Sequence, residues 1–382
     1  MVFETLTPRR SACAANACAQ NVPMLGANLA RDLTRDLSRR AQLLSGRAHV
    51  LSRLGRTQAL RMTYLAYAST LSRSWTQSSK EVTAELRRRL EALFTADWQD
   101  ARDGYYPREL TSSLPWLEYA GVAPRLLADL PRMRQRILAR RTDELDASAH
   151  DRYPGYYARN FHYQTDGYLG HTSAALYDLQ VELLFGGTAD VMRRRLIPPV
   201  VRFAREQAGG KRPLRLIDVG CGTGHLLKML GASLPDVQLC GVDLSPHYIA
   251  RARALLPREL DVSLLVENAE SLPFLPGNFD VATSVFVFHE LPSDVRARVI
   301  GEMARVVRPG GLVVLADSVQ DCDAPELKAE LRTFPARFHE PYYLSYVRDD
   351  LARRAREAGL EVIEELPAFV TRIVVARKPA AA

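Results

Sequence analysis

The sequence has few cysteines and no long apolar run. Its five cysteines are widely spaced and form neither a disulfide framework nor a CxxC pair for zinc, so no metal site is predicted. No run of about 18 apolar residues occurs, and a membrane-spanning helix is therefore not expected. Residues 11–20 are small and polar and lack the apolar core of a signal segment. We expect a reduced, cytoplasmic setting, with residues 1–24 as a flexible tail.

Lysine is scarce in the first 150 residues, where Lys80 is the only one among 23 basic residues. These residues stand against 15 acidic ones, a net charge of +8, whereas the rest of the chain holds 28 basic and 29 acidic residues. The arginines are spaced along predicted helices rather than gathered in one tract with aromatic residues between them. This spacing favours solvated helix faces, leaves an anionic substrate or a membrane surface as alternatives, and disfavours nucleic acid as a partner.

Helical apolar spacing runs from Leu25 to about Arg141. Ser78 and Glu81 have the S-x-x-E spacing of a capping box and predict the start of one helix, and a further helix is expected after Pro124. We assign residues 25–150 to an N-terminal helical domain. Two interpretations stay open: residues 25–187 form a cap over the acceptor side of a binding crevice, or the helices form a separate domain for homodimerisation or anchoring.

Residues 151–187 are dense in tyrosine and phenylalanine, and we treat residues 151–210 as an aromatic-rich linker or cap segment. Its aromatic side chains either form a small core between two domains or roof a ligand pocket. His162, Tyr163 and Asp166 add titratable groups to this segment.

From residue 211 to residue 382 short apolar runs alternate with helical stretches. Unbroken runs of this kind are typical of strands covered on both faces, and the alternation predicts a parallel, doubly wound sheet. A helix is expected over Ser293–Val307, ended by the Arg-Pro-Gly-Gly sequence at 308–311, and the last two strands are expected to pair as an antiparallel edge hairpin. The seven predicted strands are Leu214–Val219, Val237–Val242, Val262–Val266, Phe279–Phe286, Leu312–Leu315, Glu361–Leu366 and Arg372–Ala376.

A glycine-rich turn links the first of these strands to a helix. Gly220 and Gly222 let the backbone turn sharply and lie against a ligand, and Asp243 ends the next strand 19 residues after Gly224, where an acid can accept both hydroxyls of a ribose. A nicotinamide dinucleotide is one candidate ligand, but His225 stands where its fingerprint wants a third glycine. S-adenosylmethionine (SAM) is the other, since it has no phosphate and its cationic groups suit an acid such as Asp218.

Five sequence blocks from about Leu214 to Val319 resemble the class I SAM-dependent methyltransferases, and most of all the branch of ubiquinone/menaquinone-biosynthesis (UbiE-like) C-methyltransferases. The blocks are IDVGCGTG, GVDLSP, ENAESLPF, FDVATSVFVFHEL and MARVVRPGGLVVLAD. The resemblance implies a Rossmann-like fold, here with an N-terminal all-α extension, and SAM as the cofactor. Asn268 departs from the commoner Asp of the family, but its amide oxygen can still accept a hydrogen bond.

The resemblance also implies roles for individual residues. Asp218, Gly220 and Gly222 are expected to line the methionine part of SAM, Asp243 and Leu244 to hold the ribose and adenine, and Asn268 with Ala269 to face the adenine edge. Cys221 and Val285 complete the predicted cofactor-binding set.

Methyl transfer from a sulfonium depends mainly on positioning, and a general base is needed only if the acceptor loses a proton. His289 and Glu290 follow the fourth strand at the expected mouth of the site and are candidate catalytic residues, together with His162 and Tyr163. His339, Tyr342 and Tyr343 are further candidates for the acceptor pocket. Each of these side chains has a purely structural alternative.

The function predicted from these features is methyl transfer to a small aromatic or hydrophobic metabolite. The alternatives are a protein or nucleic-acid methyltransferase, a nicotinamide-dependent oxidoreductase, and a non-catalytic SAM-fold partner protein. FVFHEL stands after the fourth strand in place of an NPPY-like tetrapeptide, which disfavours a nucleic-acid substrate.

Overall fold

The computed structural model describes residues 44–63, 79–111, 116–139, 145, 151–164, 166–207, 209, 212–234 and 236–380. The predicted tail and Ser78 lie outside these residues. The chain divides into a unit of residues 1–49, in which residues 44–49 are helical, and a compact unit of residues 50–382. All that follows concerns the second unit. No helix in the described part of the chain is both long and apolar enough to cross a membrane.

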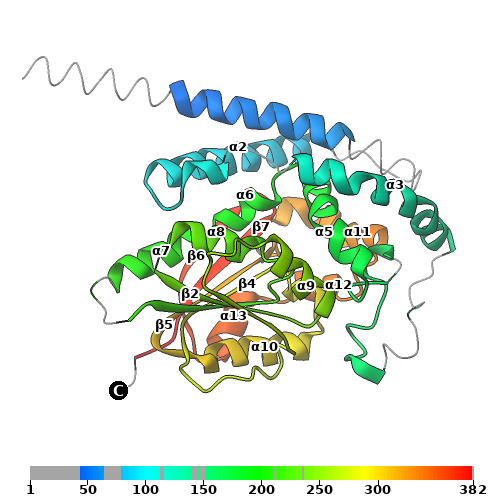
Figure 1. Ribbon diagram of the computed structural model, residues 1–382. Coiled ribbons are helices and arrows are strands. Elements are labelled where there is room, and N and C mark those ends of the chain that lie inside the picture. Colours follow the sequence, from blue (N-terminus) through cyan, green and yellow to red (C-terminus); the bar gives the residue numbers. More distant parts are fainter. Residues whose placement is uncertain are drawn as a thin grey trace, which may run out of the picture. The chain divides into compact units, whose positions relative to one another are not determined.

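A seven-stranded sheet forms the centre of this unit, with strand order β3-β2-β1-β4-β5-β7-β6 (Figure 1). The first five strands pair in parallel, and β7 pairs antiparallel with both β5 and β6. The prediction of a doubly wound, mostly parallel sheet of seven strands with an edge hairpin is confirmed. The strands are β1 (Leu214–Val219), β2 (Val237–Asp243), β3 (Val262–Val266), β4 (Phe279–Val285), β5 (Val307–Ser318), β6 (Glu361–Ala368) and β7 (Thr371–Arg377).

Both faces of the sheet are covered, because successive side chains of each strand enter opposite cores. Leu216 of β1 packs with α7 (Ile197–Glu206), α8 (His225–Ser233) and α9 (Pro246–Leu255). Its neighbour Ile217 packs with α10 (Ser293–Val306), α12 (Tyr343–Val347) and α13 (Leu351–Glu357) on the other face. This two-sided burial explains why the strands are continuous apolar runs rather than alternating ones.

The start of β5 differs from the prediction. The helix α10 ends at Val306, and the Arg-Pro-Gly-Gly sequence at 308–311 lies inside β5 rather than in a turn before it. The register between β4 and β5 jumps there, from Phe279 opposite Val307 to Val281 opposite Leu312. Residues 308–311 bulge out of the pairing between β5 and β4. On the opposite edge of β5 they keep backbone hydrogen bonds to Lys378, since Gly310 N donates to Lys378 O and Lys378 N donates to Gly311 O.

Two helix starts in the N-terminal region were predicted at the wrong residues. The helix α2 (Lys80–Arg102) is capped by Ser79, whose Oγ accepts from Val82 N at 3.2 Å, one residue after the predicted Ser78. The helix α3 (Trp116–Ala139) begins eight residues before Pro124 and carries Pro124 and Pro131 inside it. Proline disfavours but does not forbid a helix interior, and here packing of Leu126 and Tyr119 on one face outweighs its cost.

The remaining helices join the N-terminal region to the sheet. The helix α2 packs Leu93 and Phe94 into the same core as α6 (Ala189–Arg194). Arg194 of α6 donates to both carboxylate oxygens of Asp97 of α2, at 2.8 and 2.9 Å, and both side chains are buried. Residues 50–63 are also helical, and the remaining labelled helices are η1 (Arg108–Thr111), η2 (Phe161–Tyr163), α5 (His171–Leu184), η3 (Phe288–Glu290), η4 (Pro325–Leu327) and α11 (Lys328–Phe338).

Candidate cofactor and acceptor pocket

A pocket with about 830 Å³ of empty space, open to solvent, lies where β1, β2 and β4 end. This edge of an open α/β sheet, beyond the carboxyl ends of the strands, is the usual place for a ligand. Seven of the nine residues predicted to bind the cofactor line it: Gly220, Gly222, Asp243, Leu244, Asn268, Ala269 and Val285.

The glycine-rich turn after β1 forms one wall of the pocket. Gly220 has φ +73, and a Cβ there would lie 2.4 Å from Cγ2 of Val287, so no other residue fits. Gly222 has φ +54, and a Cβ there would meet only the ring of Tyr248, at 3.9 Å. Open space beside Gly222 is the cradle that a ligand lying against the backbone would fill.

Asp243 stands at the end of β2 with its carboxylate held in place. Its Oδ2 accepts from Gly222 N and its Oδ1 from Ser245 N, each at 2.9 Å. Burial raises the pKa of this carboxyl to about 6, against the lowering effect of the two amide hydrogen bonds. Asn268 lines the pocket further along, where its Oδ1 accepts from Glu270 N at 2.9 Å.

Asp218 and Cys221, the other two predicted cofactor residues, are not among the lining residues. The Asp218 side chain is buried and accepts a hydrogen bond from Thr283 Oγ1 at 2.7 Å. Burial raises the pKa of Asp218 to about 7, more than the Thr283 hydrogen bond lowers it. Cys221 is also buried, with its Sγ packed close to Gly241.

Aromatic residues of the 151–187 segment form the opposite wall: Tyr156, Tyr157, Phe161, Tyr168 and Tyr177. Hydrogen bonds attach the segment to the sheet domain. Ser245 Oγ donates to Tyr168 O at 2.7 Å, the hydroxyls of Ser173 and Tyr248 lie 2.9 Å apart, and Tyr156 Oη donates to Glu270 at 2.7 Å. Of the two interpretations left open by the sequence, the lining favours aromatic residues that roof a pocket.

Among the four residues predicted to be catalytic, Glu290 alone lines the pocket. It lies in η3 and accepts a short hydrogen bond from Tyr168 Oη. His162 lies behind Tyr168, with its Nε2 2.8 Å from Tyr168 Oη and 3.6 Å from Glu290 Oε1. On its other side, His162 Nδ1 lies 3.3 Å from Oε1 of Glu340. Burial alone would lower the pKa of His162, but the charges of Glu340 and Glu290 outweigh it and raise that pKa.

His289 is not among the lining residues and pairs with Asp317 of β5, with its Nδ1 2.6 Å from Asp317 Oδ1, while its Nε2 lies 3.7 Å from Oε1 of the lining residue Glu290. Burial alone would lower the pKa of His289, but the charge and hydrogen bond of Asp317 outweigh it and raise that pKa to about 10. A cationic imidazole is suited to positioning rather than to accepting a proton. Tyr163 is buried, and its ring lies 5.4 Å from that of His339. The catalytic roles of both residues stay predictions.

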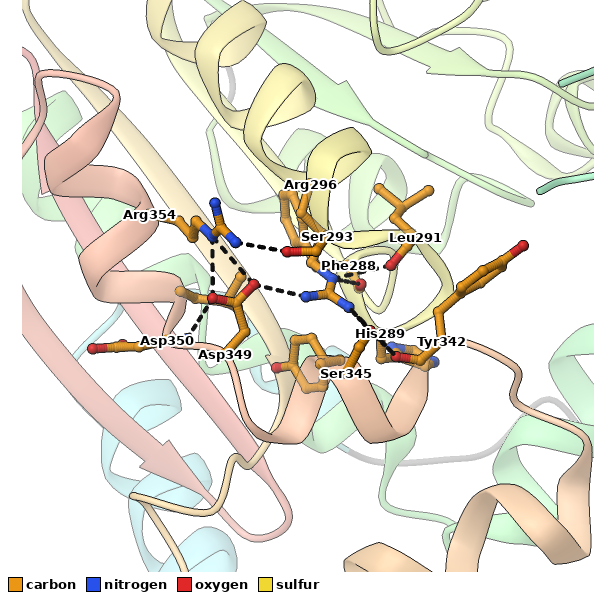
Figure 2. Close-up of polar contacts among 12 residues, drawn as sticks. Phe288, His289, Leu291, Ser293, Arg296, Tyr342, Ser345, Asp349, Asp350 and Arg354 are labelled. Atoms are coloured by element: carbon orange, nitrogen blue, oxygen red, sulfur yellow. Dashed lines mark hydrogen bonds and ion pairs between the residues drawn. The ribbon is translucent and has the colours of Figure 1, made fainter. Parts of the chain in front are cut away.

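The turn that carries His289 and Glu290 is fixed by Arg296, which is fully buried (Figure 2). Its Nε donates to Phe288 O at 3.1 Å and to Leu291 O at 3.0 Å, so one guanidinium nitrogen bonds to both ends of the turn. Its Nη1 donates to Asp349 Oδ2 at 2.7 Å, and its Nη2 donates to Ser345 Oγ. Arg296 therefore connects the turn after β4 with α12 and the start of α13.

Other residues singled out in the sequence have structural contacts outside the pocket. Tyr342 Oη accepts from Arg159 Nε at 3.1 Å, and Tyr343 Oη lies 2.6 Å from Ser318 Oγ. His339 ends α11 in a left-handed conformation. Asp166 borders a second, smaller hollow beside α5.

Two groups of functional candidates were missed in the sequence. Glu340 lies between His339 and Tyr342, which were candidates from the sequence, but no sequence pattern pointed to Glu340 itself, because its burial depends on packing between distant segments. Glu267 and Tyr248 line the pocket and follow or flank predicted strands, so their positions alone could have found them.

The charge of the lining fits SAM rather than a dinucleotide. Of the residues that the structure describes, those that line the pocket include three acids, Asp243, Glu267 and Glu290, and no lysine, arginine or histidine. A diphosphate would find no cation among them, whereas the sulfonium and ammonium groups of SAM are attracted by the acids. The aromatic and aliphatic remainder of the lining suits an adenine ring and an apolar acceptor.

Known proteins support the same conclusion. A methyltransferase domain family matches residues 216–311. The O-methyltransferase rstn1 of Aspergillus nomiae is 32% identical over 184 residues, which are 46% of this chain and 76% of rstn1. A demethylmenaquinone methyltransferase of Thermus thermophilus is 37% identical over 145 residues, 38% of this chain and 61% of that protein. A 2-methyl-6-phytyl-1,4-hydroquinone methyltransferase of Synechocystis is 35% identical over 102 residues, 27% of this chain and 31% of that protein.

The chain belongs to the class I SAM-dependent methyltransferases, in the branch that resembles the ubiquinone/menaquinone-biosynthesis enzymes. Its cofactor is S-adenosyl-L-methionine, and the nicotinamide alternative is thereby excluded. The match covers 76% of one relative but less than two thirds of the other two, and it covers less than half of this chain.

Proposed function

We propose that this protein transfers the methyl group of SAM to a small aromatic or hydrophobic metabolite. The observation that carries the proposal is the aromatic lining of the pocket, which holds five tyrosines and two phenylalanines beside the predicted cofactor residues. Such a wall favours a flat or apolar acceptor, because aromatic side chains bury large areas and stack on rings. The names of two relatives specify a demethylated menaquinone and a phytyl hydroquinone, which are acceptors of this class.

In this proposal the cofactor lies along the glycine-rich turn. Asp243 accepts hydrogen bonds from the ribose hydroxyls, Leu244 and Ala269 pack against the adenine, and Asn268 bonds to its edge. Asp218 acts from behind the turn, where its charge attracts the cationic end of the ligand. When bound, SAM supplies an activated methyl group, so the remaining task of the protein is to hold an acceptor in line with it.

We further propose that residues 151–187 cap the acceptor side of the pocket. The segment contributes five of the lining aromatic residues, and Tyr168 joins it to Glu290. A cap of this kind excludes water and holds an apolar acceptor close to the methyl group. Glu290, at the junction of cap and sheet domain, is the group we assign to the acceptor. Homodimerisation and a cytoplasmic setting stay predictions.

The proposal is tested by turnover assays with acceptors of contrasting chemistry. The full-length protein is incubated with SAM and, separately, with alkylated hydroquinones and phenols, aliphatic amines, a mixed peptide library and duplex or single-stranded nucleic acid, and S-adenosylhomocysteine formation is measured. We expect turnover with the phenolic compounds, lost in the Asp243→Ala protein. Turnover with peptides or nucleic acid alone would contradict the proposal.

A further inference from the structure

Three side chains that can bind a metal ion converge behind the acceptor wall. His162 comes from η2, Glu290 from η3 after β4, and Glu340 from the turn between α11 and α12. One potential ligand atom of each lies within 4.8 Å of the others. The fold thus brings an imidazole and two carboxylates together from segments far apart in the chain.

Glu340 lacks the hydrogen bonds that a buried carboxylate normally has. The residue is 2% exposed, and neither of its carboxylate oxygens accepts a hydrogen bond from any residue in the described part of the chain. Its Oε1 is 3.3 Å from His162 Nδ1 but outside hydrogen-bond geometry. A buried carboxylate without donors is costly, and each such group in a folded protein calls for an explanation.

A neighbouring carboxylate shows the contrast. Asp317, equally buried, accepts from Phe288 N at 2.7 Å, from His289 Nδ1 at 2.6 Å and from Ser318 N at 2.6 Å. The fold therefore supplies donors to one acid of this region and leaves the other facing His162 and Glu290. A cation between the three residues would satisfy Glu340.

We propose that His162, Glu290 and Glu340 bind one divalent transition-metal ion at the wall of the pocket. An imidazole with two carboxylates is a donor set for Mn²⁺, Fe²⁺ or Zn²⁺ rather than for Ca²⁺ or Mg²⁺, which prefer oxygen ligands alone. Three protein ligands leave coordination positions open, as in catalytic metal sites. Glu290 lines the pocket, so an ion that it binds lies next to the acceptor.

This inference rests on the proposed function and narrows it to an acceptor with a hydroxyl oxygen. A metal ion lowers the pKa of a hydroxyl that binds to it. The proton leaves to solvent, the oxygen lone pair forms the new C–O bond, and the C–S bond of the sulfonium breaks with its electron pair staying on sulfur. Glu290 then acts on the acceptor through the ion.

The competing explanation is that protons on His162 and on His289, whose Nε2 lies 3.7 Å from Glu290 Oε1, balance the two carboxylates and that no metal binds. The two explanations differ in the uptake of metal by the resting protein, which needs no acceptor and no turnover. Metal binding is therefore the primary measurement.

The experiment uses the full-length protein freed of metal by chelation. Mn²⁺ is titrated in, and the free ion is followed by its electron paramagnetic resonance signal, with Zn²⁺ measured by competition. We expect one Mn²⁺ per chain in the unaltered protein and at least about tenfold weaker binding in Glu340→Gln and in His162→Asn, since even outer partners of metal ligands typically contribute about 10–100-fold. Glu357→Gln on α13, a half-exposed carboxylate paired with Arg353, is the matched control and should bind like the unaltered protein.

SAM binding by calorimetry on the same samples reports whether each variant is folded. If Glu340→Gln loses SAM binding as well, Glu290→Gln takes its place as the test variant. Stoichiometric Mn²⁺ binding that is lost in the ligand variants supports the site, whether or not an acceptor has been found. Absence of Mn²⁺ and Zn²⁺ binding at 1:1 stoichiometry, or equal binding in the ligand variants and the control, overturns the metal site and leaves the proposed methyl transfer standing.

Discussion

Asp243 is an ionisable side chain and is also the residue proposed to accept hydrogen bonds from the ribose of SAM. It accepts two backbone hydrogen bonds, and its burial raises its pKa to about 6. The carboxylate that would accept from the ribose is therefore lost by protonation as the pH falls through about 6, in a range where an ordinary aspartate stays charged.

SAM binding is predicted to weaken as the pH falls from 7.5 to 5. Only the charged form of Asp243 offers the full set of acceptor lone pairs, so affinity is highest above pH 6 and declines below it. Asp243→Asn should weaken binding at pH 7.5 by about 1–3 kcal/mol, because an amide replaces a charged acceptor. Calorimetry at several pH values checks both points, and a variant that keeps the same pH profile as the unaltered protein would show that another group titrates.

At Gly222, the size of a substituted side chain is predicted to control the affinity for SAM. Its φ of +54 strains both Gly222→Ala and Gly222→Val, and the β-branched valine more than alanine, while valine also adds methyl groups in the space beside the turn. We expect Gly222→Val to bind SAM at least about tenfold more weakly than Gly222→Ala, measured by calorimetry. Equal affinities in the two variants would mean that strain, and not occlusion, is responsible.

The parts of the site that follow from local sequence were predictable, and those that depend on long-range packing were not. The glycine turn and Asp243 are set by the ends of adjacent strands, whose apolar runs are visible in the sequence. The pairing of His289 with Asp317 joins the turn after β4 to β5, and the burial of Glu340 depends on α11 and α12, so no local pattern indicates either. His289 therefore looked like a free base in the sequence.

At the scale of elements, the turn after β4 depends on one buried ion pair. Arg296 donates to the carbonyls of Phe288 and Leu291 and to Asp349, and Figure 2 shows these contacts converging on its guanidinium. The same α10 helix carries Arg298 two residues later, which is half exposed and pairs with Glu270 and Asp294. The helix α10 thus carries one arginine in a buried ion pair, Arg296, and one in exposed ion pairs, Arg298.

Arg296→Met is predicted to lower the free energy of unfolding by about 1–3 kcal/mol, because it removes the side-chain donor that the carbonyls of Phe288 and Leu291 share and one of the arginines paired with Asp349, which keeps Arg353 and Arg354. Arg298→Met, the control, should cost no more than about 1 kcal/mol, as expected for exposed pairs. Urea unfolding followed by circular dichroism measures both. Similar losses in the two variants would show that the Arg296 network adds no more than an exposed pair does.

The ends of the strands were predictable where the local sequence sets them and not where contacts with distant residues set them. Six of the seven strands were predicted to within two residues at each end, because burial on both faces leaves unbroken apolar runs, whereas β5 is longer at both ends than the predicted Leu312–Leu315. The Arg-Pro-Gly-Gly sequence reads as a helix stop and a turn, but its hydrogen bonds to Lys378 keep it in β5. A partner near the other end of the chain cannot be read from those four residues.

At the scale of the whole molecule, the pocket is shared between the 151–187 segment and the sheet domain. Tyr157 and Tyr168 belong to the first and Asp243 and Glu290 to the second, and all four line the same space. A ligand that fills this space contacts both parts, so its binding free energy stabilises them together. The edge hairpin of β6 and β7 contributes no residue to the lining.

Hydrogen exchange is predicted to show that a bound ligand stabilises both parts of the protein that line the pocket. On addition of saturating S-adenosylhomocysteine to the full-length protein, amides in residues 156–177 and in residues 220–248 should exchange more slowly, because opening of either part then requires loss of the ligand. Amides of β6 serve as the internal control and should change little. Exchange followed by mass spectrometry at fixed pH measures all three regions at once. Protection confined to residues 220–248 would mean that the aromatic segment does not close over the bound cofactor, and the proposed cap would then be wrong.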